Sequence, residues 1–154
     1  MYTVSVQAQD FQPGALESEL VADGGDIGAT ACFTGYVRRD PTRPALSGLS
    51  IEHYPGMTEK SMQATLDEAA ERWPVQRAGV VHRIGPLSIG ERIVWVGVAS
   101  AHRAAAFAAC EYIMDALKTT VPLWKRELGL PGTPWVEARE NDKARAARWQ
   151  KGML

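Results

Sequence analysis

The stretch QRAGVVHRIGPLSIGERIVWVGVAS, residues 76–100, holds two runs rich in valine and isoleucine. Each run predicts a β-strand, and the segment PLSIG between them is typical of a hairpin-like link. In the second run Val94, Val96 and Val98 alternate with other residues and form one face of the strand. Neighbouring strands without a helix between them favour an α+β fold with a mostly antiparallel sheet and packed helices over a doubly wound fold.

The rest of the chain supplies strands and helices that fit this class. Alternating polar and apolar residues predict a strand over 2–9, and a β-branched and aromatic run predicts a largely buried strand over 27–38. Helices are expected where the spacing of apolar residues changes to that of a helix or where a proline sits in a first turn. The expected helices are 12–22, 57–73 and 102–118, and the remaining strands are 49–54, 76–85, 91–100 and a short one within 131–139.

The helix expected at 102–118 has an apolar side, whereas the end of the chain is polar. The apolar stripe of that helix consists of Phe107, Cys110, Met114 and Leu117. Residues 141–149 are polar and predict either a terminal helix or a tail that orders only on contact. We therefore expect one domain over 1–154, with 143–154 as a candidate flexible tail.

Composition excludes several classes of protein. The chain has 154 residues, of which 45% are hydrophobic and 23% charged, so it can bury a sizeable core. The formal net charge of −1 gives no indication of binding to nucleic acid or to an anionic membrane. The N-terminus lacks the pattern of a signal peptide, and no apolar run approaches the roughly 18 residues of a membrane span. A cytoplasmic protein is expected.

The two cysteines, Cys32 and Cys110, lie far apart in the sequence and in apolar surroundings. No metal-ligand spacing is present, so no metal site is expected. Buried free thiols are favoured over a disulfide or a nucleophile.

The segment LKTTVPLWKRE, residues 117–127, places Lys118 and Lys125 on either side of a proline and a tryptophan. A lysine in such surroundings can lose hydration, lower its pKa and act as an acid or base, or it can hold a phosphate. The alternative is a helix-end cation at Lys118 and an ordinary ion pair at Lys125. We expect Pro122 and Trp124 to form a turn that returns Lys125 to Lys118.

Two further segments combine cations with the end of a strand. His102 and Arg103 follow Ser100 where a strand gives way to a helix, which is either an anion site or an N-cap with basic neighbours. Arg38 follows a strand and is either a site residue or part of a solvated turn. His53 and His82 lie in strand patterns and are expected to be core or interface histidines.

Helix geometry separates two of these candidates. Lys118 lies 16 residues after His102, which corresponds to about 24 Å along a continuous helix. One small ligand cannot reach both ends of that helix in one chain. Either one end alone is functional, or a second copy of the chain supplies the other end in a symmetric dimer.

Several segments are informative through their order and spacing: FTGYVR, EHYPGMTEKSM, VVHRIGPLSIGE, VGVASAHRAAAF, MDALKTTVPLWKRE and WVEARE. Together they resemble the family of large, catalytic subunits of molybdopterin synthase. The resemblance runs from about residue 27 to residue 142.

The resemblance implies a sulfurtransferase of molybdenum cofactor biosynthesis with an α/β-hammerhead fold. It implies conversion of cyclic pyranopterin monophosphate to molybdopterin, with two sulfur atoms arriving as a thiocarboxylate on the C-terminal Gly-Gly of a small ubiquitin-like subunit. The implied assembly is a homodimer of large subunits within a heterotetramer, and no cofactor is implied. Two rivals remain open: a non-enzymatic binding module for a phosphorylated small molecule, and a structural subunit that docks another protein.

The resemblance also assigns roles to residues. Lys118 and Lys125 fall on the family's catalytic lysines, with His102, Arg103 and Arg139 reaching the site from a neighbouring large subunit. The residues expected to hold the phosphate are Arg38, His102, Arg103 and Arg139. Leu123 stands where phenylalanine is expected, and residues 39–48 and 128–134 receive no role because these stretches vary in the family. The implied substrate-binding residues are Tyr36, Val37, Arg38, His102, Arg103, Arg126, Glu127 and Arg139.

Overall fold

The computed structural model describes residues 2–132, 135–136 and 140–150 of the chain. It confirms the α+β class, because helices pack against two sheets whose strand pairs are mostly antiparallel. The described elements, in chain order, are β1 (Tyr2–Gln7), α1 (Pro13–Val21), β2 (Ala29–Tyr36), β3 (Gly48–His53), α2 (Met57–Arg72), β4 (Val75–Arg83), β5 (Gly85–Ser88), β6 (Arg92–Ser100), α3 (Arg103–Thr119), β7 (Leu123–Leu128), β8 (Trp135–Val136) and α4 (Glu140–Ala147).

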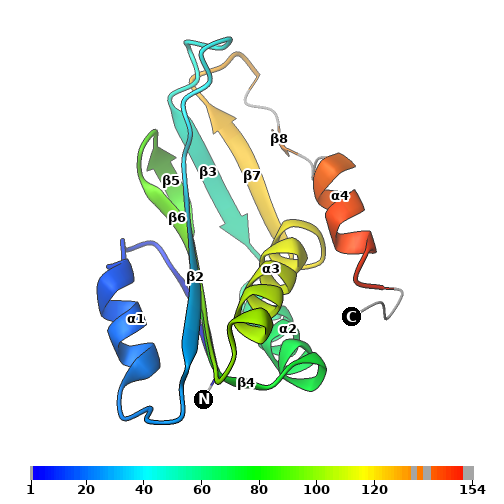
Figure 1. The fold of residues 1–154 in the computed structure, drawn as a ribbon. Helices are drawn as coiled ribbons and strands as arrows, with labels where there is room; N and C mark the ends of the chain where they lie inside the picture. The colour runs from blue at the N-terminus through cyan, green and yellow to red at the C-terminus, as the bar shows by residue number, and fades with distance from the viewer. Residues whose placement is uncertain (1, 133–134, 137–139, 151–154) are drawn as a thin grey trace.

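The first sheet has the strand order β1-β4-β6-β2. β4 and β6 pair antiparallel, as the sequence predicts, while β1 pairs parallel with β4. The link between β4 and β6 is more than a turn, because β5 lies within it and pairs with β3 of the second sheet. This link therefore joins the two sheets at one corner (Figure 1).

Helices cover both faces of the first sheet. α2 and α3 pack on one face and α1 on the other (Figure 1). Val94, Val96 and Val98 of β6 are buried in the core beneath α2 and α3. The alternate residues Trp95 and Ala99 belong to a second cluster beneath α1. Burial on both faces explains why β6 reads as a continuous apolar run.

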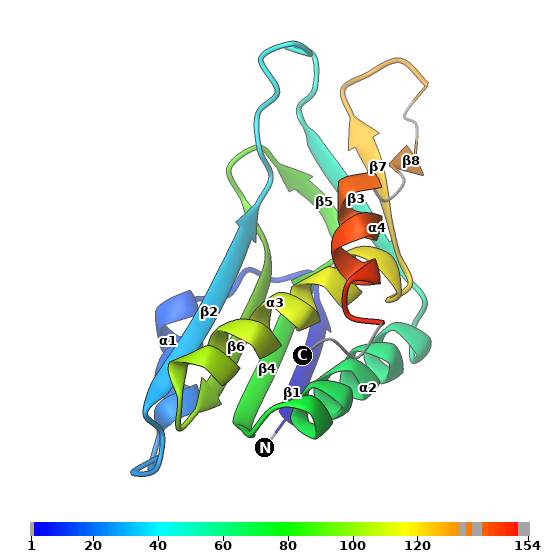
Figure 2. The same ribbon diagram turned by 45° about the vertical axis from the view of Figure 1, so that its right-hand side comes forward.

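The second sheet has the order β5-β3-β7-β8, with every pair antiparallel (Figure 2). It corrects the expectation that Pro122 and Trp124 form a turn. Trp124 lies with Lys125 on β7, which pairs along β3 from Leu123 to Leu128. The turn is confined to the residues before Leu123, and it was misplaced because the pairing with β3 is a long-range contact that local sequence does not reveal.

Three expectations of burial are wrong. β2 is an edge strand of the first sheet rather than largely buried, and the Phe33 and Tyr36 side chains are 42% and 53% exposed. Phe107, assigned to the apolar stripe of α3, is 67% exposed. Cys110 is a buried free thiol as expected, but Cys32 on β2 is exposed.

The end of the described chain is helical, which is the first of the two alternatives for 141–149. α4 packs against α3 in both ribbon views (Figures 1 and 2). The indole N–H of Trp149 donates to a carboxylate oxygen of Asp115 at 2.7 Å, and Trp149 is buried against Trp73 and Tyr112. These contacts hold α4 beside the C-terminal half of α3.

Candidate functional site

A cavity of about 1290 Å³ lies where the end of α3, the strand β7 and the loop after β2 meet. Its wall includes Lys118 and Lys125, which come from separate elements. α4 also reaches the cavity, through Asp142 and Lys143. Both lysines therefore line one cavity, and the expectation that their ammonium groups lie within reach of one substrate stays a prediction.

The turn between α3 and β7 sets the relation between the two lysines. Lys118 lies in the last turn of α3 and is exposed, whereas Lys125 is half-buried on β7 opposite Ile51. Thr58, fully buried at the start of α2, donates its hydroxyl hydrogen to the Pro122 carbonyl at 2.8 Å. The same hydroxyl accepts the Tyr54 N–H at 2.8 Å. α2 therefore anchors the turn that carries the chain from one lysine to the other.

The alternation of β7 sorts the neighbours of Lys125. Lys125 and Glu127 line the cavity, whereas Arg126 between them does not. Successive side chains of a strand point to opposite faces, so Lys125 and Glu127 share one face of β7 and Arg126 points to the other. The Arg126 guanidinium lies over the Trp135 ring, 4.2 Å from its centroid. Arg126 was predicted to bind substrate, but it does not line the cavity with Lys118, Lys125 and Glu127.

Glu127 is paired with an arginine that sequence reasoning left without a role. Arg43 donates from Nη1 to one carboxylate oxygen of Glu127 at 2.8 Å, and its Nη2 lies 2.7 Å from the other. Nε of Arg43 also donates to Asp40 at 3.0 Å. Hydrogen bonds from Thr42, followed by that from Arg43, lower the pKa of Asp40 to about 2. Arg43 and Asp40 line the cavity, and the bidentate pair fixes the loop after β2 on β7.

Tyr36, Val37 and Arg38 line the cavity as a group. The pairing of β2 with β6 shifts register between Gly35 and Tyr36, a kind of irregularity that re-aims side chains. The backbone remains held beyond it, because the Val37 N–H donates to the Glu91 carbonyl at 2.9 Å. Val37 is buried while Tyr36 and Arg38 are exposed, so the latter two offer their side chains to a ligand.

His102 and Arg103 lie at the opposite end of α3 from Lys118. α3 runs unbroken from Arg103 to Thr119, so the estimate of about 24 Å stands. Both residues are exposed, and the His102 side chain makes no capping hydrogen bond. The cavity wall includes neither of them. Arg139 lies outside the described residues.

His82, expected to be a core or interface histidine, is buried with 4% of its surface exposed and also lines the cavity. Its Nδ1 lies 2.8 Å from the Arg83 carbonyl oxygen. Burial lowers the pKa of His82 to about 4, and the positive charges of Lys125 and Lys118 add to this, against the opposing hydrogen bond to Arg83. The link to both lysines had no signal in the sequence, because β4, α3 and β7 meet only in the folded chain.

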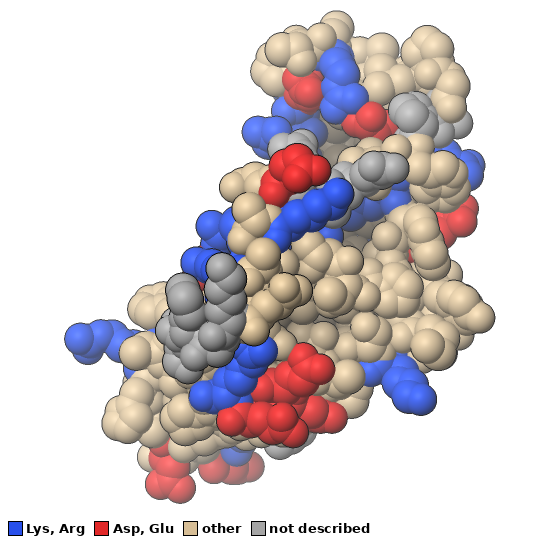
Figure 3. All heavy atoms as spheres, turned by 90° about the vertical axis from the view of Figure 1, so that its right-hand side faces the viewer, with Lys and Arg blue, Asp and Glu red and all other residues tan. Residues whose placement is uncertain are grey.

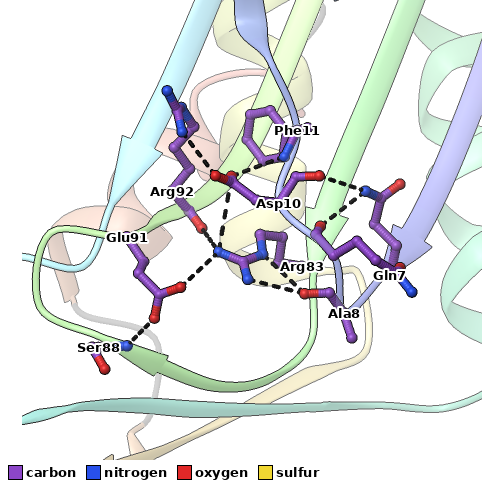
Figure 4. Close-up of polar contacts among 9 residues, drawn as sticks. Gln7, Ala8, Asp10, Phe11, Arg83, Ser88, Glu91 and Arg92 are labelled. Atoms are coloured by element: carbon purple, nitrogen blue, oxygen red, sulfur yellow. Dashed lines mark hydrogen bonds and ion pairs between the residues drawn. The ribbon is translucent and has the colours of Figure 1, made fainter.

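The Arg83 side chain, pointing to the other side of β4, is held by several acceptors (Figure 4). Nε and Nη2 donate to the Ala8 carbonyl at 3.1 and 3.0 Å. Nη1 donates to the Arg92 carbonyl at 3.1 Å and lies 3.3 Å from Glu91. Arg83 is thus fixed between the ends of β1, β4 and β6, and its backbone carbonyl is a rigid acceptor for His82.

Aromatic side chains flank the lysines. Phe33, Trp124 and Trp135 line the cavity and are each 42–46% exposed. Ring faces of this kind stack on planar ligands, and the lysines supply charge for an anion. The aromatic rings and the lysines together therefore suit the cavity to a planar, anionic small molecule. On the face that carries α4, basic and acidic side chains are interspersed (Figure 3).

The described part of the chain holds no group of three or more His, Cys, Asp or Glu side chains able to bind a metal ion. Within the same residues, none of the helices combines the length and apolar character needed to cross a bilayer.

Comparison with known proteins gives concordant results. The family model described as MoaE protein matches residues 6–120. A molybdopterin synthase catalytic subunit from Vibrio cholerae is 51% identical over 149 residues, which are 97% of this chain and 99% of the relative. A subunit of the same name from Escherichia coli is 49% identical over 146 residues, covering 95% and 97%. Molybdopterin cofactor biosynthesis protein E from Burkholderia multivorans has a TM-score of 0.83, 45% identity and 97% coverage of both chains.

Proposed function

Because this chain belongs to the MoaE protein family, we propose that it is the catalytic subunit of a molybdopterin synthase in the cytoplasm. It converts cyclic pyranopterin monophosphate to molybdopterin by inserting two sulfur atoms. The observation that carries this proposal is the cavity onto which α3 and β7 bring Lys118 and Lys125. Lysine ammonium groups at a ligand site can both bind an anion and transfer a proton.

The sulfur donor is a small ubiquitin-like subunit whose C-terminal Gly-Gly ends in a thiocarboxylate. The cavity, at about 1290 Å³, exceeds the roughly 300–1,000 Å³ of ordinary small-molecule pockets. This volume supports simultaneous occupation by the pterin and the end of a peptide. Glycines suit such a tail because they have no side chain to accommodate.

The lysines serve the substitution at the pyranopterin side-chain carbon. The thiocarboxylate sulfur forms a bond to this carbon, and a C–O bond breaks as the oxygen leaves with a proton or as a phosphate oxygen. Hydrolysis of the resulting thioester by water then breaks the acyl C–S bond, which leaves the sulfur on the pyranopterin and releases the small subunit with a C-terminal carboxylate. Lys118 or Lys125 supplies or removes the proton, and the other neutralises the thiocarboxylate. In this proposal Tyr36 and Arg38, which line the cavity and are exposed, contact the substrate.

A homodimer completes the site in this proposal. His102 and Arg103 are exposed at the far end of α3, so in one chain they are free to serve a neighbour's cavity. Together with Arg139 they hold the substrate phosphate from the second large subunit. Each dimer then carries two sites and binds two small subunits, giving a heterotetramer.

The decisive test is reconstitution with Lys118→Ala and Lys125→Ala. Purified chain, pyranopterin monophosphate and thiocarboxylated small subunit are mixed, and the dithiolene product is measured. We expect either substitution to lower the rate by about 100-fold or more, because each removes a charged group from the transition state. Lys60→Ala, an exposed lysine on α2 away from the cavity, is the matched control.

Near-normal turnover by both variants would refute the lysine roles. Binding of the pyranopterin by the unmodified chain without any product would favour a non-enzymatic binding module. Binding of the small subunit alone would favour a structural subunit.

A further inference from the structure

His82 combines burial with access to the lysine cavity. Its side chain shares a face of β4 with Ala78 and Val80, which belong to the core beneath α2 and α3. In register it lies between Val6 of β1 and Val94 of β6, and Val94 also lines the cavity. The imidazole is therefore a polar group at the place where the apolar core meets the cavity.

The hydrogen bond at Nδ1 fixes which ring nitrogen carries the proton. A carbonyl oxygen only accepts, so Nδ1 of His82 is the donor to the Arg83 carbonyl at 2.8 Å. In the neutral ring Nε2 then holds a free lone pair. The side chain of Arg83 is itself held by Ala8, Glu91 and Arg92 (Figure 4). The orientation of the imidazole is thereby coupled to a rigid framework.

Two positive charges act on this ring from different elements. Lys125 of β7 and Lys118 of α3 both interact electrostatically with His82, and both disfavour its protonation. Burial acts in the same direction and is the larger effect. A neutral nitrogen with a lone pair is the group that can accept a hydrogen bond from an ammonium ion. The other charged residues lining the same cavity are Arg38, Asp40, Arg43, Glu52, Glu127, Asp142 and Lys143.

We infer that His82 is a positioning residue of the sulfur-transfer site, whose Nε2 accepts a hydrogen bond from a lysine ammonium group, foremost that of Lys125, and holds it within the cavity. This inference rests on the proposed function, since it assigns the lysines to catalysis. A fixed hydrogen-bond acceptor restricts the rotamers of a flexible lysine side chain. A larger fraction of the molecules then holds the ammonium group in the reactive geometry.

Three substitutions separate the nitrogens of the ring. His82→Asn retains an amide near the position of Nδ1 and removes the acceptor at the position of Nε2. His82→Gln places an amide oxygen near the position of Nε2, and His82→Phe fills the volume with neither nitrogen. His53→Asn is the matched control, because His53 lies on β3 and does not line the cavity.

The first measurement needs no enzyme activity. In the unsubstituted chain, nitrogen NMR at pH 7 should show Nδ1 of His82 protonated and Nε2 unprotonated; the opposite tautomer overturns the inference. With ¹³C-dimethylated lysines, His82→Asn and His82→Phe should lower the pKa of Lys125 by about one unit, because the charged form loses an acceptor. His82→Gln should restore at least half of that shift. An unchanged lysine pKa in folded His82→Asn overturns the inference.

The second measurement is a single turnover with thiocarboxylated small subunit and pyranopterin monophosphate. His82→Asn and His82→Phe should slow sulfur transfer by about tenfold, with substrate Kd changed by less than about threefold. His82→Gln should recover part of the rate. Equal rates in all variants overturn the inference. Absence of product from the unsubstituted chain refutes the proposed function instead, and the lysine titration still decides the position of His82.

Discussion

His82 makes the stability of the fold depend on pH. The pKa of its imidazole is lowered to about 4 in the folded chain, chiefly by burial, against an ordinary value of 6.5. Between these values the unfolded chain binds more protons than the folded chain, so the free energy of unfolding rises with pH. Each unit of pKa difference corresponds to about 1.4 kcal/mol. The contribution of the neutral imidazole to the free energy of unfolding is complete above pH 6.5 and is lost as the pH falls towards 4.

We therefore predict that His82→Asn flattens the pH dependence of stability. Urea unfolding of the unsubstituted chain should show about 2–3 kcal/mol less stability at pH 4 than at pH 7 from this residue. His82→Asn should remove most of that difference, because asparagine does not titrate. His53→Asn is the control and should keep it. A pH profile shared by His82→Asn and the unsubstituted chain would count against a buried neutral imidazole.

The sequence predicts the neighbours of some site residues and not of others. Lys118 and Lys125 stand out by spacing, and the structure brings them to one cavity. The ion pair between Arg43 and Glu127 could not be predicted from spacing, because 84 residues separate the two residues. The pair forms only when β7 packs beside the loop that follows β2. His82 was expected to be a core or interface histidine and is buried, but its relation to the lysines arises from three elements packed together.

At the scale of elements, prediction succeeded where the pattern is local. The helices α2 and α3 and the strands β4 and β6 follow from apolar periodicity and β-branched runs. β7 was missed because it follows Pro122 and because the consecutive charged residues Lys125, Arg126 and Glu127 break the alternation typical of a strand. Its pairing with β3 decides otherwise. The exposure of β2 was missed because no local signal distinguishes an edge strand with an apolar face from a buried one.

The turn between α3 and β7 gives a prediction at this scale. Thr58→Val removes two hydrogen bonds, one from the Tyr54 N–H and one to the Pro122 carbonyl, while nearly preserving side-chain volume. Because the site is fully buried, water cannot replace these partners, and we expect a loss of about 1–3 kcal/mol in the free energy of unfolding. Urea unfolding measures this loss.

Thr58→Ser keeps the hydroxyl and is the control for the hydrogen bonds, because it removes only a methyl group. The rate of sulfur transfer should fall more in Thr58→Val than in Thr58→Ser. Lys125 lies only three residues after Pro122, so a displaced turn also displaces this lysine. Equal stability and activity of the two variants would show that the turn is held by its other contacts.

The whole molecule presents two distant sets of cations. The cavity gathers Lys118 and Lys125, whereas His102 and Arg103 are exposed at the other end of an unbroken α3. The rigid helix prevents a single chain from bringing the two sets to one ligand. If both sets serve the same reaction, as proposed, the functional unit is a dimer with two composite sites.

Subunit mixing tests this composite site. A dimer of His102→Ala subunits lacks the histidine at both sites, and a dimer of Lys118→Ala subunits lacks the lysine at both. In a mixed dimer one site combines both defects and the other combines an intact Lys118 with an intact His102. We therefore expect each parent dimer to be nearly inactive and verified mixed dimers to recover about half of the activity per dimer. Two differently tagged subunits, co-purified and assayed for the dithiolene product, allow the measurement. Mixed dimers without recovery would place the complete site within one chain.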